Sequence, residues 1–315
     1  MVHPLASPDI HKAAKIIKQG GLVAFPTETV YGLGADATNP AAVARIFETK
    51  DRPTFDPLIV HVPGLAQAEK LAASFPEGAR RLAKRFWPGP ITLVVPKTSA
   101  IPDLVTAGLP SVALRVPDHP TALELLAECG QPLAAPSANR FGQVSPTTAS
   151  HVKGSLGDRV DLVLDGGPCR VGVESTIVSF LSDPPLLLRP GGISTEEIEV
   201  LVGPLGKPPK DEGSPPAPGR LSDHYATKTP LYLGRDPGKG RRGFLGLAMP
   251  ENPDDYERIE VIASNGDLRE AAANLFAAMR RLDAGGLDAI VASRAPEEGL
   301  GRAINDRLLK ASRKG

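Results

Sequence analysis

Polar side chains that could bind an anionic substrate follow several apolar, strand-like segments of this chain. The first is residues 22–34 (LVAFPTETVYGLG), where an apolar run ends at Pro26 and hydroxyls and a carboxylate follow. Four later loops have the same character, and such loops at strand ends are where α/β proteins bind ligands. Together they supply Thr27 and Thr29; Lys50 and Arg52; Ser111 and Arg115; Ser137, Asn139, Ser145 and Thr147; and Ser175, Thr176 and Arg189.

These residue types suit the positioning of a substrate better than covalent catalysis. Arg and Lys neutralise phosphates or clamp a carboxylate, while hydroxyls and amides orient uncharged groups. No GxSxG, HExxH or CxxC motif and no paired acidic cluster nominates a hydrolase, a protease or a metal-redox enzyme. Each residue alone also has a structural explanation. Arg115 could close an ion pair, and His61, within LIVHV, could be an ordinary core histidine.

The elements that must position these loops alternate between helix and strand in the first half of the chain and crowd together as strands later. Closely spaced strands without crossover helices are usually antiparallel, so we predict a twisted mixed α/β sheet over residues 1–203. Helices are expected after the cap signals at Ser7, Asn39 and Ser194. Gly32 and Gly34 predict a tight turn after the first polar loop.

A change of composition divides the chain after residue 203. Residues 204–229 form a Pro-rich linker, although His224 and Tyr225 suggest that its second half makes contacts. Residues 230–315 predict a small Rossmann-like α/β domain, with helices at 267–282 and 305–310. That domain has no GxGxxG or GxxxxGK[ST] motif, so its fold alone assigns it no ligand.

Composition restricts the possible partners. With 315 residues the chain can hold two domains, and its 36 Lys+Arg balance its 36 Asp+Glu, so no overall field attracts nucleic acid or a membrane. Cys129 and Cys169 lack the spacing of a zinc site and are expected to be buried thiols. The N-terminus is unlike a signal peptide, and no apolar run approaches the roughly 18 residues of a membrane helix. We therefore expect a soluble cytoplasmic protein.

The motifs PTETVYGLG, KDRP, DPLIVHV, WPGPITLV, RVPDHP, PSAN, SPT, STIV and LRPG occur in this order and cover the first domain. In this combination the chain resembles the threonylcarbamoyl-adenylate synthases, the proteins with a YrdC-like domain. The family's K-x-R and S-x-N signature corresponds here to Lys50, Arg52, Ser137 and Asn139. The segment PGRLSDHYA before a small α/β domain is similar to the longer, two-domain subfamily, in which the linker folds back over the active site.

The resemblance implies a nucleotidyltransferase that makes L-threonylcarbamoyl-adenylate and pyrophosphate from L-threonine, ATP, and either bicarbonate or CO2, with Mg²⁺ entering on ATP rather than on protein ligands. It also implies that the product passes to a tRNA threonylcarbamoyl transferase complex, which modifies the adenosine beside the anticodon, so that this protein need not hold tRNA itself. Position by position, the threonine-binding residues correspond to Thr29, His61, Arg115, Ser137 and Ser175. The ATP-binding residues correspond to Lys50, Arg52, Asp56, Ser111, Asn139, Ser145, Thr147, Arg189 and Tyr225.

Two departures from the family pattern bear on the nucleotide end of the site. Asp56 stands where the family usually has Asn, which puts a carboxylate near ATP that could act through Mg²⁺ or a water. The linker has Ala217, Arg220 and Thr227 where the family usually has other residues, and this makes Tyr225 a weaker assignment than Arg52.

Two other classes compete with this interpretation. A non-catalytic module that binds tRNA or double-stranded RNA is disfavoured by the zero net charge and by aromatic residues at only 4%. A carbamoyl-transfer maturation enzyme contains a similar domain but also carries zinc-finger cysteines, which two cysteines cannot supply.

Overall fold

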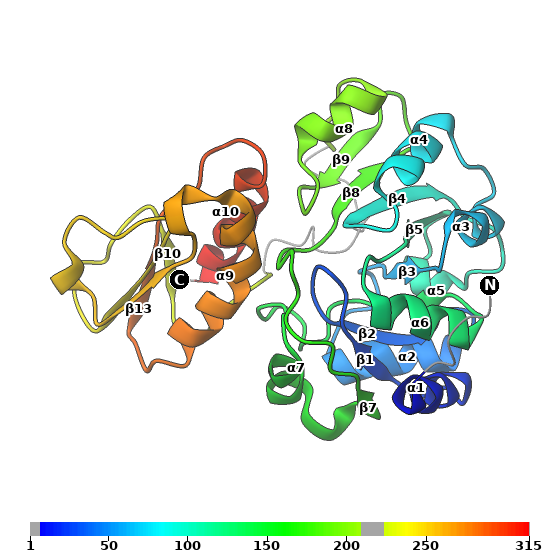
Figure 1. The fold of residues 1–315 in the computed structure, drawn as a ribbon, viewed down its shortest axis with the longest axis horizontal. Coiled ribbons are helices and arrows are strands. Elements are labelled where there is room, and N and C mark those ends of the chain that lie inside the picture. The colour runs from blue at the N-terminus through cyan, green and yellow to red at the C-terminus, as the bar shows by residue number, and fades with distance from the viewer. Residues whose placement is uncertain (1–6, 209–223, 315) are drawn as a thin grey trace.

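The computed structural model describes residues 7–208 and 224–314. It shows two α/β units (Figure 1), and the larger is a twisted mixed sheet of nine strands in the order β7-β1-β2-β6-β3-β5-β4-β8-β9. The predicted fold class is confirmed. The strands are β1 (Val23–Phe25), β2 (Gly32–Asp36), β3 (Ile59–His61), β4 (Ile91–Pro96), β5 (Ser111–Arg115), β6 (Leu133–Ala134), β7 (Leu162–Val163), β8 (Thr176–Ser179) and β9 (Leu186–Arg189).

The helices of the larger unit begin where the cap signals place them. Ser7 accepts a hydrogen bond from Ile10 N, Asn39 accepts from Ala41 N, and Ser194 forms a complete capping box with Glu197. These helices are α1 (Pro8–Lys18), α2 (Pro40–Lys50), α3 (Leu65–Leu71), α4 (Glu77–Phe86), α5 (Asp103–Thr106), α6 (Pro120–Cys129), α7 (Ala149–Leu156) and α8 (Thr195–Val202).

The tight turn predicted at Gly32 and Gly34 is wrong, because both glycines lie within β2, which pairs antiparallel with β1. Neither has a positive φ angle. A Cβ on Gly34 would come within 2.6 Å of the Phe25 ring, so glycine is needed there for close packing between the two strands. The polar loop of residues 26–31 is therefore held between two paired strands.

Alternate residues of the central strands face different environments. Val60 and Leu114 point to the main core, which α2, α3, α4 and α7 help to form. Their neighbours Ile59 and Ala113 belong instead to a small apolar cluster that contains strand residues only. Side chains alternate between the two faces of a strand. On the second face, α1 and α6 pack on β1 and β6, and the part around β3 and β5 is left to form a site.

The smaller unit has a four-stranded, all-parallel sheet in the order β10-β13-β11-β12. Its elements are β10 (Leu231–Leu233), β11 (Arg242–Gly246), β12 (Arg258–Val261), α9 (Leu268–Asp283), β13 (Ala289–Ala292) and α10 (Gly301–Ala311). The last helix begins four residues before the predicted start at residue 305. Helices α9 and α10 lie on the side of this sheet that faces the larger unit (Figure 1).

The two units approach closely at one glycine. Gly172 has a φ of 74°, and a Cβ there would lie 2.4 Å from the carbonyl oxygen of Ala272 in α9. Most of the predicted linker, including Ala217, Pro218 and Arg220, lies outside the described residues. No helix of the described chain is long and apolar enough to cross a membrane.

We predict that Gly34→Ala destabilises the protein by about 1–3 kcal/mol, because the added methyl overpacks the contact with Phe25. Gly154 in α7 has no heavy atom within 4 Å of an added Cβ, so Gly154→Ala is the matched control. It should leave the protein as stable or raise the free energy of unfolding by roughly 0.5–1 kcal/mol. Urea unfolding measures both, and equal stability of Gly34→Ala and the parent would contradict this account of β2.

Candidate active site

A cavity of about 50 Å³ lies at the ends of β3 and β5, where His61 and Arg115 reach it. It brings together three residues predicted to bind threonine, His61, Arg115 and Ser137, and two predicted to bind ATP, Arg52 and Arg189. Ligand pockets usually measure roughly 300–1,000 Å³, so the described conformation is a closed one. The remaining lining residues are Thr27, Val30, Gly32, Ile59, Ala135, Pro136, Glu174 and His224.

Strand β5 carries a residue of the predicted threonine site at one end and a residue of the predicted ATP site at the other. Arg115 at its end pairs with His61 of β3, and both side chains reach the cavity. Ser111 begins the same strand and lies on the same face, since the two positions differ by four residues. At roughly 3.3 Å per residue they are about 13 Å apart, so one strand can span from a threonine end to a nucleotide end. Ser111 does not itself line the described cavity.

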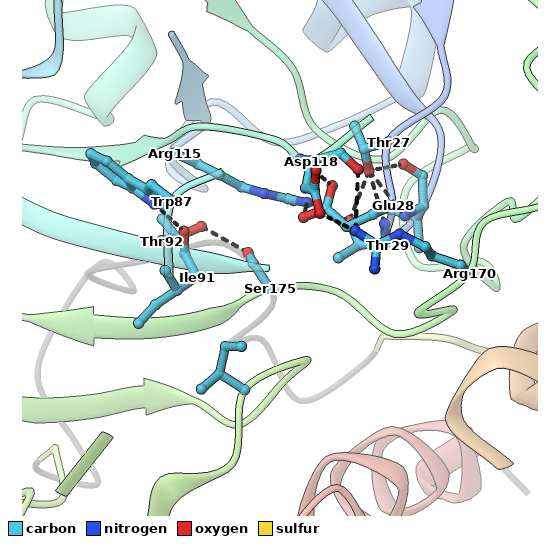
Figure 2. Close-up of polar contacts among 12 residues, drawn as sticks. Thr27, Glu28, Thr29, Trp87, Ile91, Thr92, Arg115, Asp118, Arg170 and Ser175 are labelled. Carbon is cyan, nitrogen blue, oxygen red and sulfur yellow. Dashed lines mark hydrogen bonds and ion pairs between the residues drawn. The ribbon is translucent and has the colours of Figure 1, made fainter. Parts of the chain in front are cut away.

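The guanidinium of Arg115 is held by the loop between β1 and β2. Its Nη2 lies 2.8 Å from Glu28 Oε1 and donates to Thr29 Oγ1 at 2.9 Å. The other Glu28 oxygen accepts from Asp118 N at 3.0 Å, and Figure 2 shows Arg115 pointing toward this loop. Arg115 Nε has no hydrogen-bond partner among the described residues, which leaves a donor for a carboxylate ligand.

His61 is a neutral, incompletely bonded histidine rather than a satisfied core residue. Burial, and then the positive charge of Arg115, lower its pKa to about 3. Its Nδ1 has no hydrogen-bond partner within the described part of the chain. A neutral imidazole beside Arg115 can exchange a hydrogen bond with a hydroxyl group without adding charge.

The four signature residues meet in space. Lys50, at the end of α2, is buried and donates from Nζ to the carbonyl oxygen of Ser137 at 2.5 Å and to that of Asn139. Asn139 Nδ2 donates to the carbonyl oxygens of Arg140 and Gln143. Burial, and then Arg52, lower the pKa of Lys50 well below its usual value. In this conformation Lys50 fixes the S-x-N loop and does not line the cavity.

Arg52 and Asp56 form a buried pair one turn beyond α2. Arg52 Nη2 lies 2.9 Å from Asp56 Oδ2 and donates to the carbonyl oxygen of Pro57 at 2.9 Å. Burial raises the pKa of Asp56, and the charge of Arg52 opposes this shift. The carboxylate that replaces the family's usual Asn therefore orients Arg52, which lines the cavity.

Ser175 and Arg189 form a second group, at the ends of β8 and β9. Arg189 Nη2 donates to Ser175 Oγ at 3.1 Å, and its Nε donates to the Ser175 carbonyl oxygen. The hydroxyl groups of Ser175 and Thr92 are 2.7 Å apart (Figure 2). Ser175 does not line the cavity itself, but it contacts Arg189, which does.

His224, from the end of the predicted linker, forms part of the cavity wall, and Tyr225 beside it packs against the smaller unit. Burial lowers the pKa of His224 to about 3. Tyr225 is fully buried, has a φ of 63°, and stacks on Phe276 of α9 with ring centroids 5.5 Å apart. Ala226 N donates to the carbonyl oxygen of Gly142 at 2.7 Å, which ties the segment to the S-x-N loop.

Two more of the predicted ATP-binding residues, Ser145 and Thr147, do not line the cavity. Ser145 Oγ donates to Glu174 Oε1 at 2.7 Å, whereas Thr147 contacts His151 and stays away from the cavity. Sequence patterns did not select Glu174 or its partner Arg307 in α10, which lie 2.8 Å apart. The only local signal was the position of Glu174 directly before Ser175 in the STIV motif.

Buried charge gathers at this site and nowhere else in the described chain. Among the described residues, five side chains of the basic type and three of the acidic type are buried here. Burying an ion is costly unless it is paired, so the ion pairs and hydrogen bonds described above are needed to hold these groups. They are Glu28, Lys50, Arg52, Asp56, Arg115, Glu174, Arg189 and Arg307.

Magnesium has no ready-made protein site here. Among the described residues no group of three or more His, Cys, Asp or Glu side chains is placed to hold a metal ion. Asp56 and Glu174 are the acidic side chains at the ATP end, and each is already paired with an arginine.

Family comparison agrees with this geometry. Residues 15–191 match the Sua5/YciO/YrdC family model, described as telomere recombination, and residues 193–313 match the C-terminal domain of threonylcarbamoyl-AMP synthase. The chain thus joins a YrdC-like catalytic domain to the small domain of the two-domain enzymes. It belongs to the threonylcarbamoyl-AMP synthase family.

Individual relatives match over nearly the whole chain. The threonylcarbamoyl-AMP synthase of Pyrococcus abyssi is 44% identical over 96% of this chain and 94% of its own length. The Bacillus subtilis enzyme is 44% identical over 97% and 93%. A crystal structure of P. abyssi Sua5 complexed with L-threonine superposes with a TM-score of 0.91, at 41% identity, over 98% of this chain and 96% of that one.

We predict that Arg115→Lys raises the KM for threonine by roughly 10-fold or more and leaves the KM for ATP nearly unchanged. Lysine keeps a positive charge near Glu28 but lacks the planar fork, and a charged hydrogen bond is worth about 1.5–3 kcal/mol. Initial rates against each substrate provide the test. Arg45 forms an exposed ion pair with Asp161, so Arg45→Lys is the control for an arginine-to-lysine exchange outside the site. Equal effects on both substrates would make Arg115 a structural residue.

Acid should destabilise the protein through its buried neutral histidines. The folded pKa of His61, about 3, lies below the unfolded value of 6.5, so its contribution is present above pH 6.5 and lost as the pH falls toward 3. Between these two pH values His61 makes the unfolding free energy of the parent fall by about 1.4 kcal/mol for each unit that the pH falls. His61→Gln should lack this part of the slope. Urea unfolding at pH 4.5, 5.5, 6.5 and 7.5 measures this, with pH 7.5 as the reference above this range. A variant with the parent's slope at low pH would refute the assignment.

Proposed function

We propose that this chain synthesises L-threonylcarbamoyl-adenylate and pyrophosphate from L-threonine, ATP, and bicarbonate or CO2. The observation that carries the proposal is that three buried arginines, Arg52, Arg115 and Arg189, line one cavity. A carboxylate substrate and a triphosphate substrate are the acceptors that such guanidinium groups bind. The relatives' name, threonylcarbamoyl-AMP synthase, supports the same product.

The reaction needs no nucleophilic side chain. The amine of threonine attacks CO2, forms an N–C bond and loses a proton, which gives a carbamate. A carbamate oxygen then attacks the α-phosphorus of ATP, the bond to the β-phosphate oxygen breaks, and pyrophosphate leaves. Arg115 would hold the threonine carboxylate, and neutral His61 would exchange a hydrogen bond with the threonine hydroxyl. Holding the two reactants in line can supply much of the rate enhancement.

The nucleotide end would stabilise charge on the phosphates. Arg52 and Arg189 line the cavity, and both are buried, which strengthens their interaction with phosphate oxygens. Lys50 would hold Ser137 and Asn139 at fixed positions relative to these two arginines. Mg²⁺ that enters with ATP would neutralise part of the phosphate charge.

The segment of His224 and Tyr225 would act as a lid. The cavity of the described conformation is smaller than the two substrates, and movement of this segment, which supplies His224 to the wall, would enlarge it. Once closed, it would exclude water from a labile carbamate and its mixed anhydride. A structure of P. abyssi Sua5 in which a His-Tyr pair is replaced by alanine superposes at a TM-score of 0.89, with 41% identity over 96% of this chain and 92% of that one.

As a nucleotidyltransferase, the protein would hand its adenylate to a tRNA threonylcarbamoyl transferase complex. We place this in the cytoplasm, since the reaction consumes ATP and its product serves tRNA. Direct contact with tRNA is not required for the chemistry.

One incubation tests the proposal. The protein is mixed with ATP, Mg²⁺, L-threonine and labelled bicarbonate, and pyrophosphate and labelled adenylate are both measured. Synthesis of the adenylate is expected. Retention of tRNA without any adenylate would instead favour the RNA-binding alternative and overturn the proposal.

The same assay tests the role of Arg52. Replacing Arg52 alone would leave Asp56 buried and unpaired, so Arg52→Gln is made in an Asp56→Asn background. We predict that the double variant is roughly 10- to 100-fold slower than Asp56→Asn, as expected for the loss of a charged hydrogen bond of about 1.5–3 kcal/mol. Equal rates in the two proteins would show that Arg52 does not contact the phosphates.

A further inference from the structure

Arg307 is a completely buried arginine that the smaller unit contributes to the edge of the active site. It lies in α10, and it is the largest fully buried side chain of the described chain. Its Nε donates to Glu174 Oε2 at 2.8 Å, and its Nη1 donates to the Pro190 carbonyl oxygen at 3.0 Å and to Asp306 Oδ2 at 2.7 Å. Burying a guanidinium ion is costly. Docking of the smaller unit on the larger one would not by itself require a buried arginine.

Glu174 connects Arg307 to the predicted ATP residues. One of its oxygens takes the Arg307 hydrogen bond and the other accepts from Ser145 Oγ at 2.7 Å. Burial alone would raise the pKa of Glu174, but Arg307, Arg189 and the hydrogen bonds outweigh it and lower the pKa to about 2. Glu174 is therefore a carboxylate at neutral pH. Because the Ser145 hydroxyl donates its proton to Glu174, the Ser145 oxygen can only accept a hydrogen bond from any other group.

Arg307 also bridges the ends of two strands. Glu174 precedes β8 and Pro190 follows β9, and these antiparallel neighbours bring Ser175 and Arg189 together at the same edge. The guanidinium further lies 5.3 Å from the ring centre of Tyr225, so it contacts the proposed lid. One side chain thus touches three segments that carry predicted site residues.

We propose that Arg307 is a positioning residue for the adenylate-forming reaction, through which the small domain fixes Glu174, the β8–β9 edge and the Tyr225 ring at the nucleotide end of the site. The inference rests on the proposed function. It gives the small domain a defined role in ATP binding. Arg115 and Thr29, two of the residues predicted to bind threonine, are held by the β1–β2 loop. Ser175, a third, directly follows Glu174 at the β8–β9 edge and contacts Arg189. Arg307 therefore acts mainly, but not exclusively, on the nucleotide end.

Docking of the two units does not depend on Arg307 alone. Arg302, one turn earlier on α10, forms an ion pair of 3.0 Å with Glu196 of α8, and both side chains are partly exposed. Arg280 of α9 donates to the carbonyl oxygen of Val144. Arg302→Ala therefore removes an arginine between the same two units without touching the site, and it is the matched control.

The test uses the full chain in the adenylate assay, with calorimetry for threonine affinity. Arg307→Met is combined with Glu174→Gln, because the pair then leaves no uncompensated buried charge. We expect this variant to unfold within a few degrees of the parent. Its KM for ATP should rise about 10-fold or more, as for the loss of one or two hydrogen bonds. Its threonine affinity should fall by clearly less, because Arg115 and Thr29 keep their contacts with the β1–β2 loop. Arg307→Lys, which keeps the charge beside Glu174, should give a smaller rise.

Several results would overturn the inference. One is a parental KM for ATP in both Arg307 variants. Another is a loss that affects ATP and threonine equally, or that Arg302→Ala reproduces, because either would show that Arg307 serves only docking. A parent protein that makes no adenylate would overturn the proposed function, and the inference with it, whereas an active parent with unaffected variants would overturn the inference alone.

Discussion

Five cations are buried around one small cavity, and the rest of the structure is arranged to compensate them. Arg115 is paired with Glu28, Arg52 with Asp56, and Arg307 with Glu174. Lys50 and Arg189 donate to backbone carbonyl oxygens of the loops beside them. The partners of Arg115 and Arg307 come from segments far apart in the sequence, so these two ion pairs also fix one segment against another, whereas Arg52 and Asp56 belong to the same loop. The electrostatic requirement of the site therefore determines how its loops are held.

This arrangement explains why few predicted residues point directly into the cavity. Thr29 and Asp56 contact the arginines that line it, and Lys50 holds the loop that presents Ser137. Such side chains act on substrates through a neighbour whose orientation they set. A family signature therefore includes residues that support the binding groups as well as the binding groups themselves.

Local features could be predicted from the sequence, and long-range pairings could not. Ser7, Asn39 and Ser194 begin helices as expected, because a cap is decided by residues within one turn. Gly34 was assigned to a turn, since its actual reason, the Phe25 ring across the strand pair, depends on strand register. Arg307 and Glu174 are 133 positions apart, and neither periodicity nor motif spacing connects them. The resemblance named candidate residues around the cavity but not the salt bridges that orient them.

The small domain shows how analogy of fold alone would mislead. In an open parallel sheet a ligand is expected at the carboxyl ends of the strands, and this domain has that topology without a phosphate loop. Its contacts with the active site instead come from its helices, through Phe276 of α9 and Arg307 of α10. Both side chains meet Tyr225, which the chain supplies just before the domain begins. The domain is therefore better understood as a docking surface for the lid than as a nucleotide-binding unit that has lost its ligand.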